Sequence, residues 1–276
     1  MQEVSLSAGT VRYRDTGSGP PVLFVHGLLV NGLLWRKVVP GVEGTARCIV
    51  PDWPLGAHTP AMNPAADLTP RGVSRLIGEF IDKLGLDDVT VVGNDTGGAL
   101  VQLLAGERPE RVGRIVLTPC DSFDNFLPPM FKGLQLAARV PGGLTSMMQP
   151  LRVRTLRRLP IAFGWLVKHG TDGDVYDEML RAYFTQRDVR RDTRRFVAAI
   201  SKHDTLEAAE KLRAFEAPAL VVWAREDKVF PFAHAERLVE LLPQGRLEVV
   251  DDSYSFVPED QPERLAELIA GFVGSA

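Results

Sequence analysis

The feature that constrains this chain most is the segment Gly-Asn-Asp-Thr-Gly-Gly at residues 93–98. It follows the run Val-Thr-Val-Val, which is typical of a buried strand, and it precedes an apolar stretch with helical spacing. A strand that turns directly into a helix forces the residue at the tip, Asp95, into a strained conformation. Glycine at positions 93 and 97 lets the crossing chain segments pack closely. The pattern therefore predicts that the Asp95 side chain projects from a sharp strand-to-helix turn.

Strands and helices alternate along most of the chain. Short runs rich in β-branched residues end in polar or glycine turns, and amphipathic segments separate them. This alternation predicts an α/β fold, a mostly parallel sheet with helices on both faces. Residues 4–19 form two short alternating runs about a glycine-containing turn and predict a leading hairpin. The predicted strands are 21–27, 47–52, 89–95, 114–120, 219–227 and 246–252, and the predicted helices are 69–85, 96–110, 232–243 and 261–273.

The alternation stops in the arginine-rich stretch 121–212, which has no convincing strand. We interpret this stretch as a helical cap inserted over the carboxyl edge of the sheet, where ligand sites of α/β domains form. The α/β core then consists of residues 1–120 and 213–276. The arginines are expected to form a solvated helix face with local acidic partners, and an anionic ligand or partner is the alternative. The helix-like pieces within the insertion are 131–140, 175–184 and 193–200.

Composition narrows the classes of function. Of the 276 residues, 45% are hydrophobic and 24% charged, which is typical of a globular protein with a large core. The net charge of -3 gives no basic surface for nucleic acid. Cys48 and Cys120 lie in apolar runs and are expected to be buried free thiols. The chain shows no secretory signal or membrane span, so we expect a cytoplasmic protein that binds a small molecule, with no membrane partner, metal or cofactor. Its oligomeric state is left open.

Several segments resemble the α/β-hydrolase superfamily, in particular the branch of haloalkane dehalogenases and epoxide hydrolases that uses an aspartate nucleophile. The resemblance implies the α/β-hydrolase fold, with Asp95 at the nucleophile elbow where most members carry serine. It places Asp227 at the position of the catalytic acid. It also implies that the backbone N–H groups of Leu28 and Thr96 form the oxyanion hole. The resembling segments are 22–35, 50–60, 93–98, 226–231 and 252–269.

The aspartate changes the chemistry that the elbow can perform. A carboxylate with an ordinary pKa of about 3.9 is already ionised at neutral pH, whereas a serine hydroxyl needs a base. Asp95 could therefore attack a saturated carbon that carries a halide or an epoxide oxygen and form an alkyl ester. The resemblance implies that a water activated by histidine then hydrolyses this ester.

The histidine segment departs from the family. Ser255 stands where the resemblance expects the histidine, and Tyr254 replaces the glycine before it. Serine cannot act as a general base near neutral pH, so the hydrolytic step lacks its usual catalyst. Among the five histidines, His203 in the insertion is the best candidate for a substitute base.

The groups that would stabilise the leaving group also differ. The family's dehalogenases carry Trp and Asn at the positions of Thr96 and Leu28, which weakens that interpretation. Its epoxide hydrolases use two cap tyrosines, and a tyrosine hydroxyl suits hydrogen bonding to an alkoxide. Each aromatic candidate for substrate binding also has an interpretation as a packing residue. These candidates are Trp165, Tyr176, Tyr183 and Tyr254.

Three hypotheses of function remain open. The first is hydrolysis of a small apolar molecule through Asp95, with epoxide opening favoured over dehalogenation. The second is an isomerase, lyase or cyclase that uses Asp95 as a base. The third is a ligand-binding protein derived from a hydrolase. Asp121 follows the predicted strand 114–120, and the resemblance places it at a position that some family members use for the acid. Without a histidine to orient, Asp121 and Asp227 could both be structural remnants.

Overall fold

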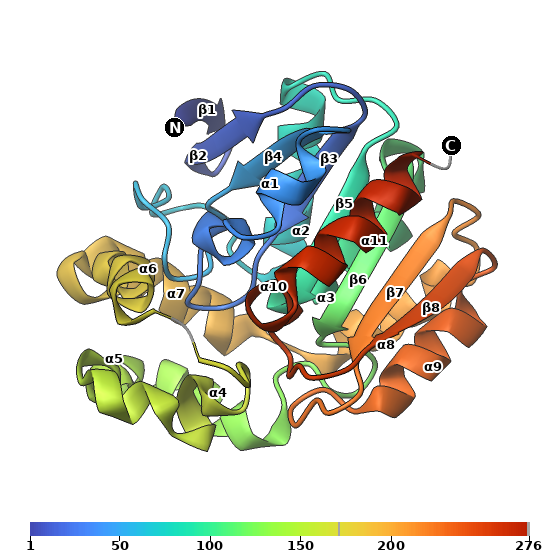
Figure 1. Ribbon diagram of the computed structural model, residues 1–276. Helices are drawn as coiled ribbons and strands as arrows, with labels where there is room; N and C mark the ends of the chain where they lie inside the picture. The colour runs from blue at the N-terminus through green and yellow to red at the C-terminus, as the bar shows by residue number, and fades with distance from the viewer. Residues whose placement is uncertain (171, 275–276) are drawn as a thin grey trace.

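An eight-stranded sheet runs through the molecule in the order β1-β2-β4-β3-β5-β6-β7-β8 (Figure 1). The computed structural model describes residues 1–170 and 172–274. β1 and β2 form the predicted antiparallel hairpin, β2 pairs antiparallel with β4, and the remaining pairs are parallel. The predicted α/β fold is confirmed. The strands are β1 (Gln2–Leu6), β2 (Gly9–Thr16), β3 (Pro21–Val25), β4 (Arg47–Pro51), β5 (Thr90–Asp95), β6 (Arg114–Cys120), β7 (Ala219–Ala224) and β8 (Gly245–Val250).

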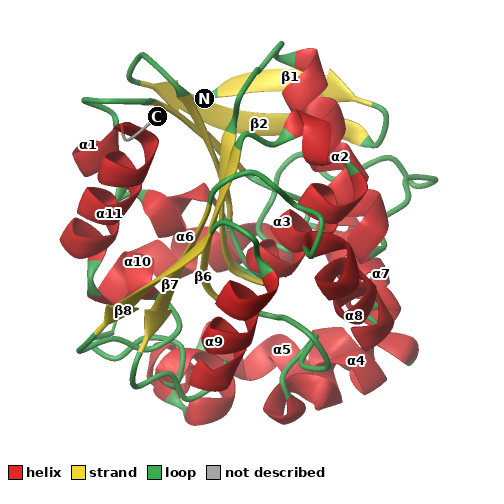
Figure 2. Cartoon of the chain, turned by 90° about the vertical axis from the view of Figure 1, so that its right-hand side faces the viewer, coloured by secondary structure: helices red, strands yellow, loops and turns green. Residues whose placement is uncertain are grey.

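Helices cover both faces of the sheet (Figure 2). On one face lie α1 (Val39–Val42) and α11 (Pro262–Gly274), which contact each other. On the other face lie α2 (Pro70–Lys83), α3 (Thr96–Glu107) and α9 (Phe232–Leu241). A single turn, α10 (Val257–Asp260), precedes α11. No helix among the described residues is long and apolar enough to cross a lipid bilayer.

The segment between β6 and β7 lies beyond the carboxyl ends of the parallel strands (Figure 1). Its last helix, α8 (Lys202–Leu212), packs against α3 on the sheet face, although the predicted insertion extended to residue 212. Turns of 3-10 and π-helix lie between residues 149 and 164. The α-helices of this segment are α4 (Lys132–Arg139), α5 (Gly143–Met148), α6 (Gly173–Thr185), α7 (Arg187–Ala199) and α8 (Lys202–Leu212).

Local sequence explains where the elements begin and end. The Thr69 side chain accepts a hydrogen bond from the backbone N–H of Gly72, and Pro70 occupies the first turn of α2. Gly85, with φ of 59°, follows this helix and adopts the left-handed conformation that favours glycine. β3, β5, β6 and β7 are almost entirely buried because helices cover both sides of the sheet.

Some arginines of the insertion have local acidic partners, as the sequence predicts. Arg154 pairs with Asp174 and Asp177, and the buried Arg157 also pairs with Asp177. These pairs tie the 3-10 turns near residue 155 to the first turns of α6. Cys48 and Cys120 are buried free thiols, as expected.

Candidate active site

Asp95 ends β5 and immediately precedes α3, with φ of 55° and ψ of -132°. This strained conformation is the one that the sequence predicts for the tip of the turn. A side chain at Gly97 would overlap the carbonyl oxygen of Val25 on the neighbouring strand. A Cβ at Gly93 would lie 2.7 Å from the Cα of Gly98. The glycines are therefore required by close backbone approach, and the turn directs the Asp95 side chain away from the sheet.

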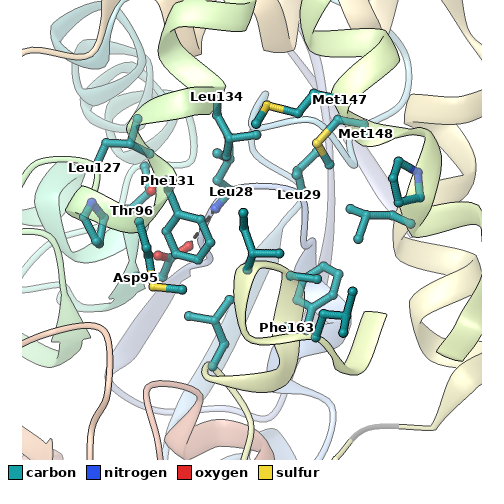
Figure 3. A pocket seen from close by; sticks show the side chains of 18 of the residues that line it. Leu28, Leu29, Asp95, Thr96, Leu127, Phe131, Leu134, Met147, Met148 and Phe163 are labelled. Carbon is teal, nitrogen blue, oxygen red and sulfur yellow. Dashed lines mark hydrogen bonds between the residues drawn. The ribbon is translucent and has the colours of Figure 1, made fainter. Parts of the chain in front are cut away.

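Two backbone N–H groups hold the Asp95 carboxylate. The N–H of Leu28 donates to Asp95 Oδ2 at 3.0 Å, and the N–H of Thr96 also donates to the carboxylate (Figure 3). The family resemblance implies that these same two groups form an oxyanion hole. Burial raises the pKa of Asp95 to about 6, and the two N–H groups oppose this shift. The side chain is therefore mainly ionised at pH 7.

A second carboxyl group, Asp121, lies beside the first. It follows β6, whose last residue, Cys120, pairs with Asp95 in the sheet. The Thr96 hydroxyl donates to Asp121 Oδ2 at 3.1 Å, and the Leu127 N–H donates to Oδ1 at 2.9 Å. Burial raises the pKa of Asp121 well above its usual range, and the Asp95 charge raises it further. Because like charges this close disfavour double ionisation, Asp121 holds the proton while Asp95 is ionised.

Both carboxyl groups face one cavity of about 290 Å³ beneath the segment between β6 and β7. Asp95, Thr96 and Asp121 are the polar side chains among its described lining residues, and the other lining side chains are apolar. Leu28 and Phe131 lie beside the carboxylate, and Leu29, Met147 and Met148 line the cavity further from it (Figure 3). The cavity therefore suits an apolar molecule with one polar reacting centre.

The buried Ser255 and the half-buried Asp227 form a pair that does not line this cavity. The Ser255 hydroxyl donates to Asp227 Oδ1 at 2.9 Å, and the N–H groups of Val229 and Phe230 donate to the same oxygen. Burial raises the pKa of Asp227 to about 7. The Asn94 side chain donates to the Ser255 carbonyl at 2.9 Å and fixes this loop beside β5. Ser255 thus occupies the expected histidine position and gives no base to the cavity.

None of the five histidines lines the cavity in the described part of the chain. His203 is exposed in the first turn of α8, so the structure does not support it as a substitute base. His26 is buried, accepts from the Trp53 N–H at 2.8 Å, and has its pKa lowered by burial to about 4. It therefore acts as a neutral structural group behind the turn that presents Leu28.

The structure also does not bring the four aromatic candidates to the cavity lining. Tyr176 stacks on Phe163 with ring centroids 4.4 Å apart, and Tyr183 is buried in α6. Tyr254 lies under the ammonium groups of Lys168 and Lys228. Trp165 is 38% exposed at the surface. Sequence spacing placed these residues in the right region, but side-chain direction depends on how each helix packs.

Comparison with known proteins identifies the family. The family model described as "alpha/beta hydrolase fold" matches residues 20–262, and this chain therefore belongs to the α/β-hydrolase fold family. Haloalkane dehalogenase 2 of Mycobacterium tuberculosis is 29% identical over 274 residues, covering 95% of this chain and 91% of that protein. The chain is thus similar to haloalkane dehalogenases, and this similarity supports the prediction of a hydrolase.

Two further likenesses agree with this assignment. A 2-hydroxy-6-oxononadienedioate/2-hydroxy-6-oxononatrienedioate hydrolase of Paraburkholderia phymatum is 25% identical over 285 residues, covering 98% of this chain and 93% of that protein. The crystal structure of a protein described as an ancestral haloalkane dehalogenase superposes with a TM-score of 0.82 and 26% identity, covering 100% of this chain and 99% of the other.

Proposed function

We propose that this protein is a hydrolase that opens a small, uncharged epoxide, with Asp95 as the nucleophile. The observation that carries the proposal is the pair of carboxyl groups at the base of one apolar cavity. Asp95 is strained, held by two N–H groups and mainly ionised at pH 7. Asp121 beside it retains a proton. One group can therefore attack while the other supplies the proton that the reaction needs.

The opening step uses both groups. An Asp95 oxygen attacks an epoxide carbon and forms a carbon–oxygen ester bond, while the bond from that carbon to the ring oxygen breaks. The released oxygen takes the proton of Asp121, which becomes a carboxylate. The Thr96 hydroxyl and the Leu127 N–H hold the two oxygens of Asp121 in place for this transfer. A positioned general acid of this kind contributes typically about 10²- to 10⁴-fold to the rate.

The ionised Asp121 then supplies the base that Ser255 cannot. It removes a proton from water, and the water oxygen attacks the carbonyl carbon (Cγ) of the Asp95 ester. The N–H groups of Leu28 and Thr96 stabilise the resulting oxyanion. Asp121 returns its proton to the departing alcohol oxygen. The re-formed Asp95 acid then transfers its proton to Asp121, and the starting state is restored with one water consumed.

Dehalogenation is the second candidate, because haloalkane dehalogenase 2 of M. tuberculosis is 29% identical to this chain. The dehalogenases that the sequence resembles carry Trp and Asn at the positions that Thr96 and Leu28 occupy in this chain. The polar side chains lining the described cavity are two carboxyl groups and a threonine, which favours the epoxide. Release of chloride or bromide from a haloalkane, without turnover of any epoxide, would reverse this preference.

The test is single-turnover reaction of a panel of apolar epoxides with the wild type, Asp95→Asn and Asp121→Asn, followed by mass spectrometry of the intact protein. We expect diol from the wild type and no covalent adduct on Asp95→Asn. Asp121→Asn should lose about 10²- to 10⁴-fold in turnover, because an amide neither donates a full proton nor accepts one. Any adduct that it forms on Asp95 should persist.

Asp87→Asn is the matched control, since Asp87 is fully exposed and distant from the cavity lining. Unchanged turnover in Asp95→Asn would contradict the proposal. Conversion without a covalent adduct would instead favour Asp95 as a base in an isomerisation, elimination or cyclisation. Thermal stabilisation by the epoxides with no product would favour a ligand-binding protein.

A further inference from the structure

We propose that the surface around the cavity mouth docks onto an anionic lipid bilayer. This inference goes beyond the proposed reaction, does not depend on it, and departs from the sequence-based expectation of no membrane partner. The surface, called here the apolar-basic surface, consists of exposed side chains between residues 132 and 165. Its apolar members are Leu136, Val140, Met147, Val153, Leu156, Leu159, Ile161 and Trp165. Its basic members are Lys132, Arg139, Arg152 and Arg158.

The exposed apolar side chains are concentrated in one segment. Ten large hydrophobic side chains are exposed among the described residues, and eight of these belong to the apolar-basic surface. Leu136 is 69% exposed and Ile161 is 61% exposed. α4 carries Leu136 and α5 carries Met147, and the two helices contact each other along the edge of the molecule (Figure 1). Such clustering marks an interaction site, because scattered single residues are the ordinary case.

The charge of the segment points to an anionic partner. Between Asp124 and Asp172 the sequence has seven lysines and arginines and no aspartate or glutamate, in a chain whose net charge is -3. Arg154, Arg157 and Lys168 pair with carboxylates outside this stretch. Within residues 1–170 and 172–274, Lys132, Arg139, Arg152 and Arg158 form no such ion pair, which leaves four cations to meet an anionic surface.

The apolar-basic surface is continuous with the cavity. Met147, Leu156, Leu159 and Ile161 are both exposed and part of the cavity lining, so they form its mouth. Docking through these residues would set the mouth against the lipid. Aliphatic side chains that enter the interface, with lysine and arginine beside them for the headgroups, are the composition of interfacial membrane-binding segments.

A second copy of the chain is the competing occupant. In a two-fold symmetric dimer the same surface meets itself. Two such surfaces would bring unpaired cations together with no carboxylate between residues 125 and 171 to compensate them. A bilayer with anionic headgroups supplies both the opposite charge and an apolar layer for Ile161 and Trp165, and we therefore favour it.

The experiment is flotation of the full chain with vesicles of phosphatidylcholine alone and of phosphatidylcholine mixed with phosphatidylglycerol. We expect binding to the mixed vesicles, weaker binding to the neutral vesicles, and loss of binding as salt is raised. Each basic side chain near an anionic surface contributes about fivefold to partitioning. The variant Lys132→Gln/Arg139→Gln/Arg158→Gln should therefore bind roughly 100-fold more weakly.

A second variant, Leu136→Ser/Val140→Ser, tests the apolar part without altering the cavity lining. It should weaken binding to both kinds of vesicle. Lys83→Gln and Leu206→Ser are matched controls, because these exposed residues lie on α2 and α8 outside the apolar-basic surface. Circular dichroism checks that each variant folds, and light scattering after gel filtration measures its oligomeric state.

Three outcomes would overturn the inference. The first is equal flotation of the wild type with and without phosphatidylglycerol. The second is binding by the two surface variants that matches the controls. The third is a wild-type dimer that Leu136→Ser/Val140→Ser dissociates while vesicle binding stays unchanged, which would assign the surface to a second copy of the chain.

Discussion

Replacing Asp95 by asparagine should stabilise the fold at neutral pH while it abolishes turnover. The substitution preserves shape and leaves an amide oxygen that can accept from the Leu28 N–H, as the carboxylate does at 3.0 Å. It removes a charge that burial disfavours. The elbow therefore holds Asp95 at a cost to stability, which is the usual relation between a reactive group and its scaffold.

The size of the gain follows from the pKa. Burial raises the pKa of Asp95 from its ordinary 3.8 to about 6, and one pKa unit corresponds to about 1.4 kcal/mol. If the whole pKa shift were counted as free energy of unfolding, Asp95→Asn would gain about 3 kcal/mol. Asp95 is half-buried and one side of it faces the cavity, so screening by solvent should reduce this figure, and we expect about 1 to 2 kcal/mol at pH 7.

The gain should depend on pH in a defined direction. A carboxyl whose pKa is higher in the folded than in the unfolded state loses stability as pH rises between the two values. For Asp95 this window runs from about pH 4 to about pH 6. Asparagine does not titrate, so the advantage of Asp95→Asn should be absent near pH 4 and complete by pH 7.

Urea denaturation of both proteins from pH 4 to pH 7.5 measures this difference, with Asp87→Asn as the control for loss of an exposed carboxylate. Parallel stability curves for wild type and Asp95→Asn across this range would refute the reasoning. So would a variant that is less stable than the wild type at pH 7.

Two further predictions concern the pair behind the elbow. Burial raises the pKa of Asp227 to about 7, so the wild type should lose stability between pH 5 and pH 7 whereas Asp227→Asn should not, and the variant should gain up to about 3 kcal/mol in unfolding free energy at pH 8 relative to pH 5. Its turnover should stay within about twofold of wild type, because Asp227 orients Ser255 rather than a base; a loss of 100-fold would show that Asp227 takes part in the chemistry. Ser255→His should speed decay of the Asp95 ester in mass spectrometry, at a cost of about 1 to 3 kcal/mol for overpacking a fully buried position. Decay at the wild-type rate would show that a histidine there cannot reach the ester.

Much of the fold could be predicted from the sequence because a strand that is buried on both faces of the sheet is a continuous apolar run. The strand predicted at 114–120 has the same first and last residues as β6. Thr69 and Gly85 predicted the two ends of α2 to within two residues. The position of α8 could not be predicted in this way. Its packing against α3 depends on how the chain returns to the sheet after the insertion, which is a long-range property.

The residues of the candidate site also differ in whether local sequence could predict their positions. Asp95 and the N–H groups of Leu28 and Thr96 belong to local turns, which motifs encode. Asp121 came next to Asp95 only through the register of β6 against β5, where Cys120 pairs with Asp95. The sequence signal for this position is that Asp121 is a polar residue directly after the strand 114–120, which pairs with the strand that carries Asp95. The orientation of the tyrosines could not be predicted because helix packing determines it.

The central claim is that Asp95 attacks carbon and is then regenerated by water. A single turnover of an apolar epoxide with excess enzyme in ¹⁸O-labelled water tests this directly, by mass spectrometry of the peptide that contains Asp95 and of the diol. The account predicts that ¹⁸O enters the Asp95 carboxylate and that the diol from this first turnover carries none. Label in the diol with an unlabelled Asp95 would show that water attacks the epoxide itself, and would contradict the account.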